Sequence, residues 1–254
     1  MSVAIITPYF QEDRGTLERC LASVRAQTVP CTHWLVADGH AQPWLDDAAV
    51  RHLKLDRAHG DFGNTPRAVG GILAASEGFD AIAFLDADNW LDPGHVEACI
   101  TTAAAAAAQG EEADYIVARR RLVRDDGSVL PVQTDDDRDG SHVDTNCYFL
   151  LPGAFHTLGQ WGVMPKPLSI VGDRVYLASL RRQGLRTATC TQVTVNYLCT
   201  WANVFRNLGE TPPPYAKSSI DTAPLAAWWQ GLDARDRELV DRLAQAPIQL
   251  GTSA

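Results

Sequence analysis

A short apolar run that ends in two aspartates constrains this chain most. Residues 81–85 read AIAFL, a run with β-branched and aromatic members that is typical of a buried strand. Asp86 and Asp88 follow it directly. Residues two apart on a strand share a face, so we expect the two carboxylates about 6–7 Å apart along one face. Such a pair can hold Mg²⁺ or Mn²⁺, and through it a diphosphate. The alternative is a solvated loop in which Asp92 and Pro93 begin the next helix.

Strand-like and helix-like segments alternate along the first half of the chain. Apolar runs at 3–6 and 34–37 predict buried strands, and Leu17, Leu21 and Val24 repeat at helical spacing between them. This alternation is typical of βαβ units around a mainly parallel sheet. Ligands of such sheets bind at the carboxyl ends of the strands.

Polar residues stand at the carboxyl ends of three predicted strands. Thr7 and Pro8 end the first, Asp38 ends the second, and Asp86 and Asp88 follow the strand described above. Each group alone also fits a turn that merely ends a strand. Because all three would meet at one edge of the sheet, their convergence predicts a ligand site there.

Composition limits the partners of the chain. Its 254 residues, 46% of them hydrophobic, suffice for one large α/β domain. A net charge of −9 argues against binding to nucleic acid or an anionic membrane. No apolar run approaches the roughly 18 residues of a membrane span, and the first residues lack a signal-peptide pattern. Six scattered cysteines without a CxxC pair fit reduced thiols, so we expect a cytoplasmic protein.

Five segments together resemble glycosyltransferase family 2, an inverting family with the GT-A fold. In chain order they read AIITPYF, LERCLASVRAQT, WLVADGH, NTPRAVGGILAASEG and IAFLDADNWLDPG, and they cover about the first 100 residues. The resemblance implies a GT-A, Rossmann-like nucleotide-binding α/β fold with a mixed, mainly parallel sheet flanked by helices. It also implies a nucleotide-sugar donor, most often a UDP-sugar, and a divalent cation, Mn²⁺ or Mg²⁺, at a DxD motif.

The resemblance assigns donor-binding roles by position. The residues concerned are Thr7, Pro8, Tyr9, Asp38, Arg67, Asp86, Ala87 and Asp88. The first three resemble the edge that touches base and ribose, Asp38 resembles an acid at uracil, and Arg67 a basic residue of the nucleotide loop. Asp86 resembles the acid on the ribose or donor side and Asp88 the metal ligand, with Asp86 as a second metal ligand. The pattern departs at Ala37 and Ala68, where the family often has a second acid and an asparagine.

An acidic residue in the second half is the expected general base. Asp173 resembles the acid that begins the family's acceptor-side helix, with Gly172 in place of the usual glutamate. An acceptor hydroxyl must lose its proton as it attacks the anomeric carbon, and a free aspartate, with a pKa of ~3.9, is ionised at neutral pH. We therefore expect Asp173 to be the base, with Asp144 as the alternative. Asp173 also fits an acid that only stabilises a helix N-terminus.

Other segments of the second half allow two interpretations each. Arg206 is either a phosphate contact or a surface cation, and residues 134–141 are either a solvated acidic loop or a lid. Trp161 either stacks on a sugar or packs in the core. Residues 223–244 predict one helix or a helix pair, whose apolar face packs on the body of the enzyme or forms a homodimer.

These expectations combine into one hypothesis. Residues 1–115 form a nucleotide-sugar-binding half, 116–211 an acceptor-binding half of the same domain, and 212–254 a linker and C-terminal helical extension. The protein is an inverting glycosyltransferase that moves a sugar to a saccharide or other hydroxyl-bearing acceptor. The alternatives are a catalytically silent nucleotide-sugar-binding protein of the same fold and, ranked lower, a sugar nucleotidyltransferase. The latter would need a basic, glycine-rich loop after the first strand, where this chain reads TPYFQEDRGT.

Overall fold

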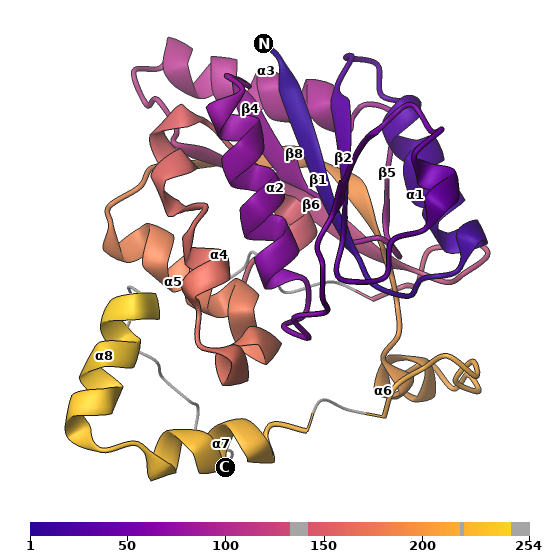
Figure 1. Cartoon of the computed structure of the whole chain (residues 1–254). Coiled ribbons are helices and arrows are strands. Elements are labelled where there is room, and N and C mark those ends of the chain that lie inside the picture. The colour runs from indigo at the N-terminus through magenta and orange to yellow at the C-terminus, as the bar shows by residue number, and fades with distance from the viewer. Residues whose placement is uncertain (133–141, 219–220, 245–254) are drawn as a thin grey trace.

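One mixed sheet forms the centre of the computed structural model, which describes residues 1–132, 142–218 and 221–244 (Figure 1). Its strands are β1 (Val3–Tyr9), β2 (Thr32–Ala37), β3 (Arg51–Lys54), β4 (Ala81–Phe84), β5 (Trp90–Leu91), β6 (Tyr115–Val123), β7 (Tyr148–Leu150) and β8 (Thr187–Leu198). They lie in the order β3-β2-β1-β4-β7-β6-β8-β5. The first four in this order are parallel, and β7 runs antiparallel between β4 and β6. β8 pairs parallel with β6 and antiparallel with β5. The expected mixed α/β sheet is confirmed.

Helices cover both faces of this sheet. They are α1 (Arg14–Arg25), α2 (Asn64–Ser76), α3 (His95–Ala108), α4 (Gln160–Val163), α5 (Gly172–Arg182), α6 (Ala202–Asn207), α7 (Ala223–Gly231) and α8 (Ala234–Ala244). Short 3₁₀ helices are η1 (Pro43–Leu45), η2 (Thr145–Cys147), η3 (Pro152–Thr157) and η4 (Lys166–Val171). In Figure 1, α2 lies in front of the first strands and contacts α4, whereas α3 lies behind against β6 and β8.

Close packing of α2 on the sheet depends on a glycine. A Cβ atom at Gly70 would lie 2.7 Å from Ile6 Cγ2 and 2.9 Å from Val36 Cγ2, too near for any side chain. On the other face, α1 packs Leu17 and Leu21 against Leu35. Both faces of the first strands are therefore buried, which explains why these strands read as continuous apolar runs.

The turn after β4 corrects one expectation from the sequence. The strand ends at Phe84, and the backbone N–H of Asn89 donates to the carbonyl of Asp86 at 3.0 Å. Asp86 and Asp88 therefore lie in a turn, and the prediction that they share one face of a strand is wrong. A turn sets the spacing of their carboxylates by local hydrogen bonds instead of by the strand repeat.

The structure also decides between the alternatives that the sequence left open for Asp92 and Trp161. Asp92 does not cap α3, whose N-cap is Gly94, because its carboxylate pairs with Arg121. Trp161 lies in α4, is 1% exposed and stacks on Tyr176 with the ring centroids 4.3 Å apart, so it packs in the core, although it also lines the candidate pocket described below. Residues 134–141 lie outside the described residues.

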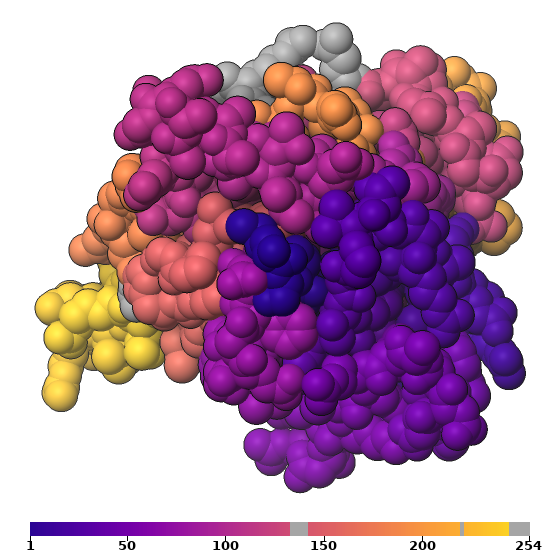
Figure 2. Space-filling model, turned by 90° about the horizontal axis from the view of Figure 1, so that it is seen from above, coloured from indigo at the N-terminus to yellow at the C-terminus, as the bar shows by residue number. Residues whose placement is uncertain are grey.

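The C-terminal residues form the expected helix pair. α7 and α8 are the yellow helices at the lower left of Figure 1, and they project from one side of the body in Figure 2. α7 contacts η4, and α8 contacts α4 and α5. Trp228 and Trp229 pack against the main core, so the body of the protein covers part of the apolar face.

The described part of the chain holds no helix long and apolar enough to cross a membrane. All six cysteines are free thiols, as expected. The sheet runs through both the 1–115 and the 116–211 segments, and these boundaries stay a prediction. Figure 2 shows the side on which β1 begins, and the polar strand ends lie at the opposite edge of the sheet.

Candidate active site

A pocket of about 490 Å³ opens at the carboxyl ends of the parallel strands. Seven of the eight residues expected to bind the donor line it, namely Pro8, Tyr9, Asp38, Arg67, Asp86, Ala87 and Asp88. Asp173 and Asp144 line the same pocket, although they come from the second half of the chain. The structure thus brings together five aspartates that the sequence places up to 135 positions apart, from Asp38 to Asp173.

Thr7 is the exception among these residues. Its side chain is fully buried under α1, and its hydroxyl lies 2.8 Å from His33 Nε2. It does not line the pocket, so its side chain supports the strand instead of facing a ligand. Tyr9 does line the pocket, but its hydroxyl forms a hydrogen bond with His52, 2.7 Å from Nε2.

Asp38 organises the loop that precedes α2. Its Oδ1 accepts from the backbone N–H of His59 at 2.9 Å and lies 2.7 Å from the His59 ring Nδ1. The loop held in this way presents Phe62 at the pocket, with 70% of that residue exposed. The φ of Phe62 is 56°, a left-handed backbone that is uncommon for a large side chain. One carboxylate therefore shapes one wall of the pocket.

Asp86 is held from two sides. Arg67, which is 2% exposed, donates from Nη2 to Oδ1 at 2.8 Å. Asn146 Nδ2 donates to the other oxygen at 3.0 Å. Arg67 is fixed in turn by Asn64 Oδ1 at 3.1 Å and by the Trp161 ring, whose centroid lies 4.9 Å from its guanidinium carbon. Asp86 is thus a positioned carboxylate with a neutralising partner.

Asp88 has a different environment from Asp86. Burial, followed by the neighbouring carboxylates of Asp86 and Glu12, raises the pKa of Asp88 to about 7. The Lys217 ammonium acts in the opposite direction, but more weakly. No salt bridge to Asp88 is present among the described residues, so this carboxylate is short of positive charge.

The residues at this turn fit a divalent cation. They do not form a cage made only of protein ligands, because the described ranges contain no cluster of three or more His, Cys, Asp or Glu side chains that could hold a metal ion. Mg²⁺ typically takes only one or two protein carboxylates and completes its shell with water and substrate phosphates. Asp88, half-buried and without a salt-bridge partner among the described residues, matches such a ligand, and Asp86 beside it keeps unused lone pairs.

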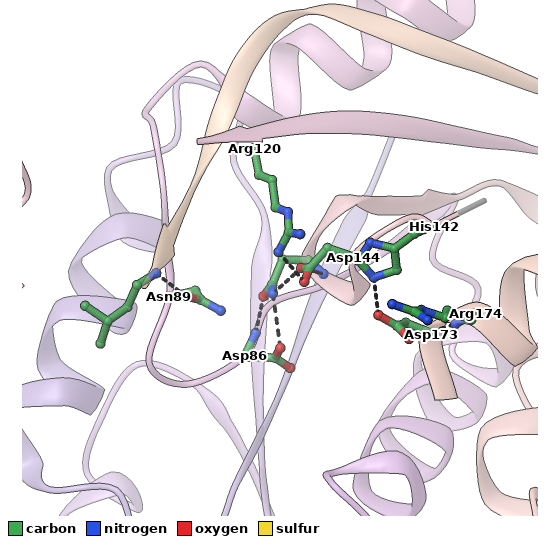
Figure 3. Close-up of polar contacts among 9 residues, drawn as sticks. Asp86, Asn89, Arg120, His142, Asp144, Asp173 and Arg174 are labelled. Carbon is green, nitrogen blue, oxygen red and sulfur yellow. Dashed lines mark hydrogen bonds and ion pairs between the residues drawn. The ribbon is translucent and has the colours of Figure 1, made fainter. Parts of the chain in front are cut away.

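Asp173 and Asp144 differ in the side chains that bind their carboxylates, one for Asp173 and two for Asp144 (Figure 3). Asp173 Oδ2 lies 2.5 Å from His142 Nε2, and its Oδ1 accepts from the backbone N–H of Arg174 at 2.7 Å. Asp144 is 7% exposed and bonds through both oxygens, to Arg120 at 2.8 Å and to Asn146 at 2.7 and 3.0 Å. Burial raises the pKa of Asp144 despite the Arg120 charge.

Several residues in the pocket or directly behind its acids had no signal in the sequence. Asn146 and His142 act on acids 60 and 31 positions away, and such long-range partners leave no local pattern. Lys217 follows a proline run, yet a backbone bridge to Trp201 returns it to the pocket. Arg206, either a phosphate contact or a surface cation by sequence, is exposed on α6 and does not line the pocket, which favours the surface cation.

Open α/β sheets bind their ligands, nucleotides among them, at the carboxyl ends of their strands, where this acidic pocket lies. The sequence profile described as "Glycosyl transferase family 2" matches residues 4–133. The chain belongs to this glycosyltransferase family. No protein of curated function matches the chain in sequence.

Solved structures similar to this chain share its fold at low identity. The crystal structure of S. aureus TarS 1-349 in complex with UDP aligns with a TM-score of 0.57 and 13% identity, covering 96% of this chain and 70% of that one. The complex of the same protein with UDP-GlcNAc gives 0.56 and 11%, covering 96% and 71%. A further TarS structure gives 0.55 and 14%, covering 82% and 39%. These likenesses confirm the expected GT-A fold.

Proposed function

We propose that this glycosyltransferase moves a sugar from a UDP-sugar to an acceptor hydroxyl, with inversion at the anomeric carbon. The observation that carries the proposal is the shared pocket, in which Asp38, Asp86 and Asp88 face the same space as Asp173. Family membership supports the transfer chemistry. The UDP and UDP-GlcNAc named in the TarS complexes support uridine as the nucleoside.

In the proposed reaction, Asp173 accepts the proton of the acceptor hydroxyl as its oxygen bonds to the anomeric carbon. The bond from that carbon to the diphosphate oxygen breaks, and UDP leaves with the electron pair. Asp173 is the better base because its carboxylate bears one side-chain partner, whereas Asp144 is bound by Arg120 and Asn146.

Asp88 and Asp86 would hold the cation in this proposal. When bound, Mn²⁺ or Mg²⁺ would supply positive charge to the leaving diphosphate. Lys217 lines the pocket with an exposed ammonium near Asp88, so it replaces Arg206 as the candidate phosphate contact. Pro8 and Asp38, at the ends of β1 and β2, border the space for the nucleoside.

A thermal-shift panel tests donor and metal together. UDP, GDP and ADP are added to the chain with Mn²⁺ or with EDTA. We expect UDP with Mn²⁺ to raise Tm by about 5–10 °C at a hundredfold excess over Kd. GDP or ADP with Mn²⁺, and any of the three nucleotides with EDTA, should raise Tm less. Equal shifts for all three nucleotides would remove uridine from the proposal, and no shift with any would remove nucleotide binding.

Turnover separates the enzyme from a silent binding protein. The chain is incubated with a panel of UDP-sugars and Mn²⁺, and released UDP is measured with water and with added saccharides as acceptors. Release above the protein-free rate supports the transferase. Binding of UDP without release for any donor would favour the silent nucleotide-sugar-binding protein.

A further inference from the structure

One short segment reaches both sides of the pocket. We propose that residues 142–146, the 142–146 bridge, fix the donor-side carboxylate of Asp86 and the base Asp173 relative to each other. Asn146 and His142 are the two positioning residues, because each contacts one of these acids directly. This inference rests on the proposed function and adds to it how the two reacting partners are held in register.

Asn146 binds the turn of Asp86 through its whole amide group. Its Oδ1 accepts from the backbone N–H of Asp86 at 2.5 Å, and its Nδ2 donates to Asp86 Oδ2 at 3.0 Å. The second amide hydrogen points to Asp144 Oδ1, 2.7 Å away. Asn146 is fully buried, so water cannot replace these bonds.

The chemistry required at position 146 is specific. The side chain must accept one hydrogen bond from a backbone N–H and donate two to carboxylates, which only one orientation of the Asn146 amide allows. An aspartate of the same shape would place a third carboxylate between two others. A leucine would fill the volume and leave the N–H of Asp86 without its partner.

Asp144 anchors the middle of the bridge to the sheet. Its Oδ2 accepts from Arg120 Nη1 at 2.8 Å, and Arg120 lies over the Tyr197 ring with 4.5 Å between guanidinium carbon and ring centroid. Figure 3 shows this chain of contacts from Arg120 through Asp144 toward Asp86. Because Arg120 lies on β6 and Tyr197 on β8, these contacts tie the bridge to two strands of the sheet.

His142 supports the base from behind. Its Nε2 lies 2.5 Å from Asp173 Oδ2, and Figure 3 shows the imidazole directed at this carboxylate. Asp173 lines the pocket, whereas His142 is not among the lining residues. His142 therefore acts through Asp173, by holding its carboxylate at the pocket.

Four variants test the bridge. Asn146→Leu removes the bonds to Asp86, His142→Phe removes the contact to Asp173, and His142→Gln restores a donor there. Thr194→Val is the matched control, because Thr194 is buried, lies 2.9 Å from His95 Nδ1 and does not line the pocket. The readouts are UDP affinity with Mn²⁺, release of UDP from a UDP-sugar, and amide hydrogen exchange at residues 85–88.

The two ends of the bridge have different expected effects. Asn146→Leu raises the Kd for UDP with Mn²⁺ about tenfold and speeds exchange at residues 85–88. His142→Phe leaves that Kd within about twofold but lowers turnover about 10- to 100-fold, and His142→Gln recovers part of the loss. Thr194→Val lowers Tm without moving either value.

Two results would overturn the bridge. One is Asn146→Leu with wild-type exchange at residues 85–88, and the other is His142→Phe and His142→Gln with equal turnover. The exchange measurement needs no nucleotide, so it decides the role of Asn146 by itself. Failure of the wild-type chain to bind UDP would count against the proposed function, and wild-type exchange in Asn146→Leu would count against the bridge.

Discussion

Arg67 and Asp86 form an ion pair in the pocket wall, with 2.8 Å between Nη2 and Oδ1. The Arg67 side chain is 3% exposed and that of Asp86 is 32% exposed, so the pair joins a buried cation to a carboxylate at the pocket. Asp86 therefore carries a permanent counter-charge, whereas Asp88 has no ion pair among the described residues and feels only the weaker charge of Lys217.

Removal of the buried cation should destabilise the fold. We expect Arg67→Met to lower the free energy of unfolding by about 2 kcal/mol, less than a fully buried pair would lose because water reaches Asp86. Urea unfolding measures this. Arg14→Ala is the control, because both members of the Arg14–Glu18 pair are more than half exposed, and its loss should stay below about 0.5 kcal/mol. Equal losses in the two variants would contradict the role of burial.

Two aspartates in the pocket should respond differently to the same substitution. Asp173→Asn should lower UDP release from a UDP-sugar about 10²- to 10⁴-fold and leave UDP binding intact, because the proton acceptor is lost. Asp144→Asn should chiefly lower Tm, since it weakens the contact to Arg120. Steady-state turnover and UDP titration separate these outcomes. An Asp144→Asn chain with wild-type stability and no turnover would transfer the base role to Asp144.

The sequence predicts those parts of the fold that depend on local pattern. Residues 3–6 and 34–37 form strands, because burial on both faces leaves a continuous apolar run. The spacing of Leu17, Leu21 and Val24 marks a helix, because burial along one stripe leaves a helical period. The position of the acids at strand ends also follows from the order of elements. The family resemblance added Asp173, which no local pattern distinguishes from other acids at helix starts.

Features set by distant partners could not be predicted. Asp86 leaves the strand because the turn bonds to Asn146, 60 positions later, and Thr7 is covered by α1 and bonds to His33. His142 supports Asp173 across 31 positions. Each of these contacts depends on how elements pack in space, and neighbouring residues carry no trace of it.

Two buried histidines should make the protein sensitive to acid. Burial lowers the pKa of His33 to about 3 and that of His95 to about 4. An unfolded histidine has a pKa of about 6.5, so below that pH the unfolded chain binds more protons and stability falls. Each histidine should cost about 2 kcal/mol of stability at pH 5 relative to pH 8.

The acid effect is best measured as a difference between proteins. Asp88 has a raised pKa and titrates in the opposite sense over part of the same range, so the wild-type slope alone mixes both contributions. A chain with His33→Gln and His95→Gln is compared with the wild type by urea unfolding at pH 8, 6.5 and 5. We expect the free energy of unfolding of the wild type, minus that of the double variant, to fall as the pH falls. A constant gap would show that these histidines do not govern acid stability.

Asp88 should oppose the fold when no cation is present. Its carboxylate is half-buried near those of Asp86 and Glu12, so Asp88→Asn removes a charge that Lys217 compensates only weakly. In EDTA at pH 8, we expect Asp88→Asn to raise the free energy of unfolding by about 1–2 kcal/mol. With Mn²⁺ in place of EDTA, we expect this variant to lose the rise in Tm that UDP gives the wild type. Urea unfolding and thermal shift measure the two effects.

Asp92→Asn is the matched control for this last prediction. Asp92 lies four positions further along, but its carboxylate pairs with Arg121 and accepts from Asn196 Nδ2 at 2.8 Å. Its substitution should therefore destabilise the chain and keep the response to UDP and Mn²⁺. Opposite signs would mean that Asp88 serves a ligand and Asp92 serves the fold. An Asp88→Asn chain that is less stable than wild type, or that still responds to Mn²⁺ with UDP, would remove Asp88 from the metal site.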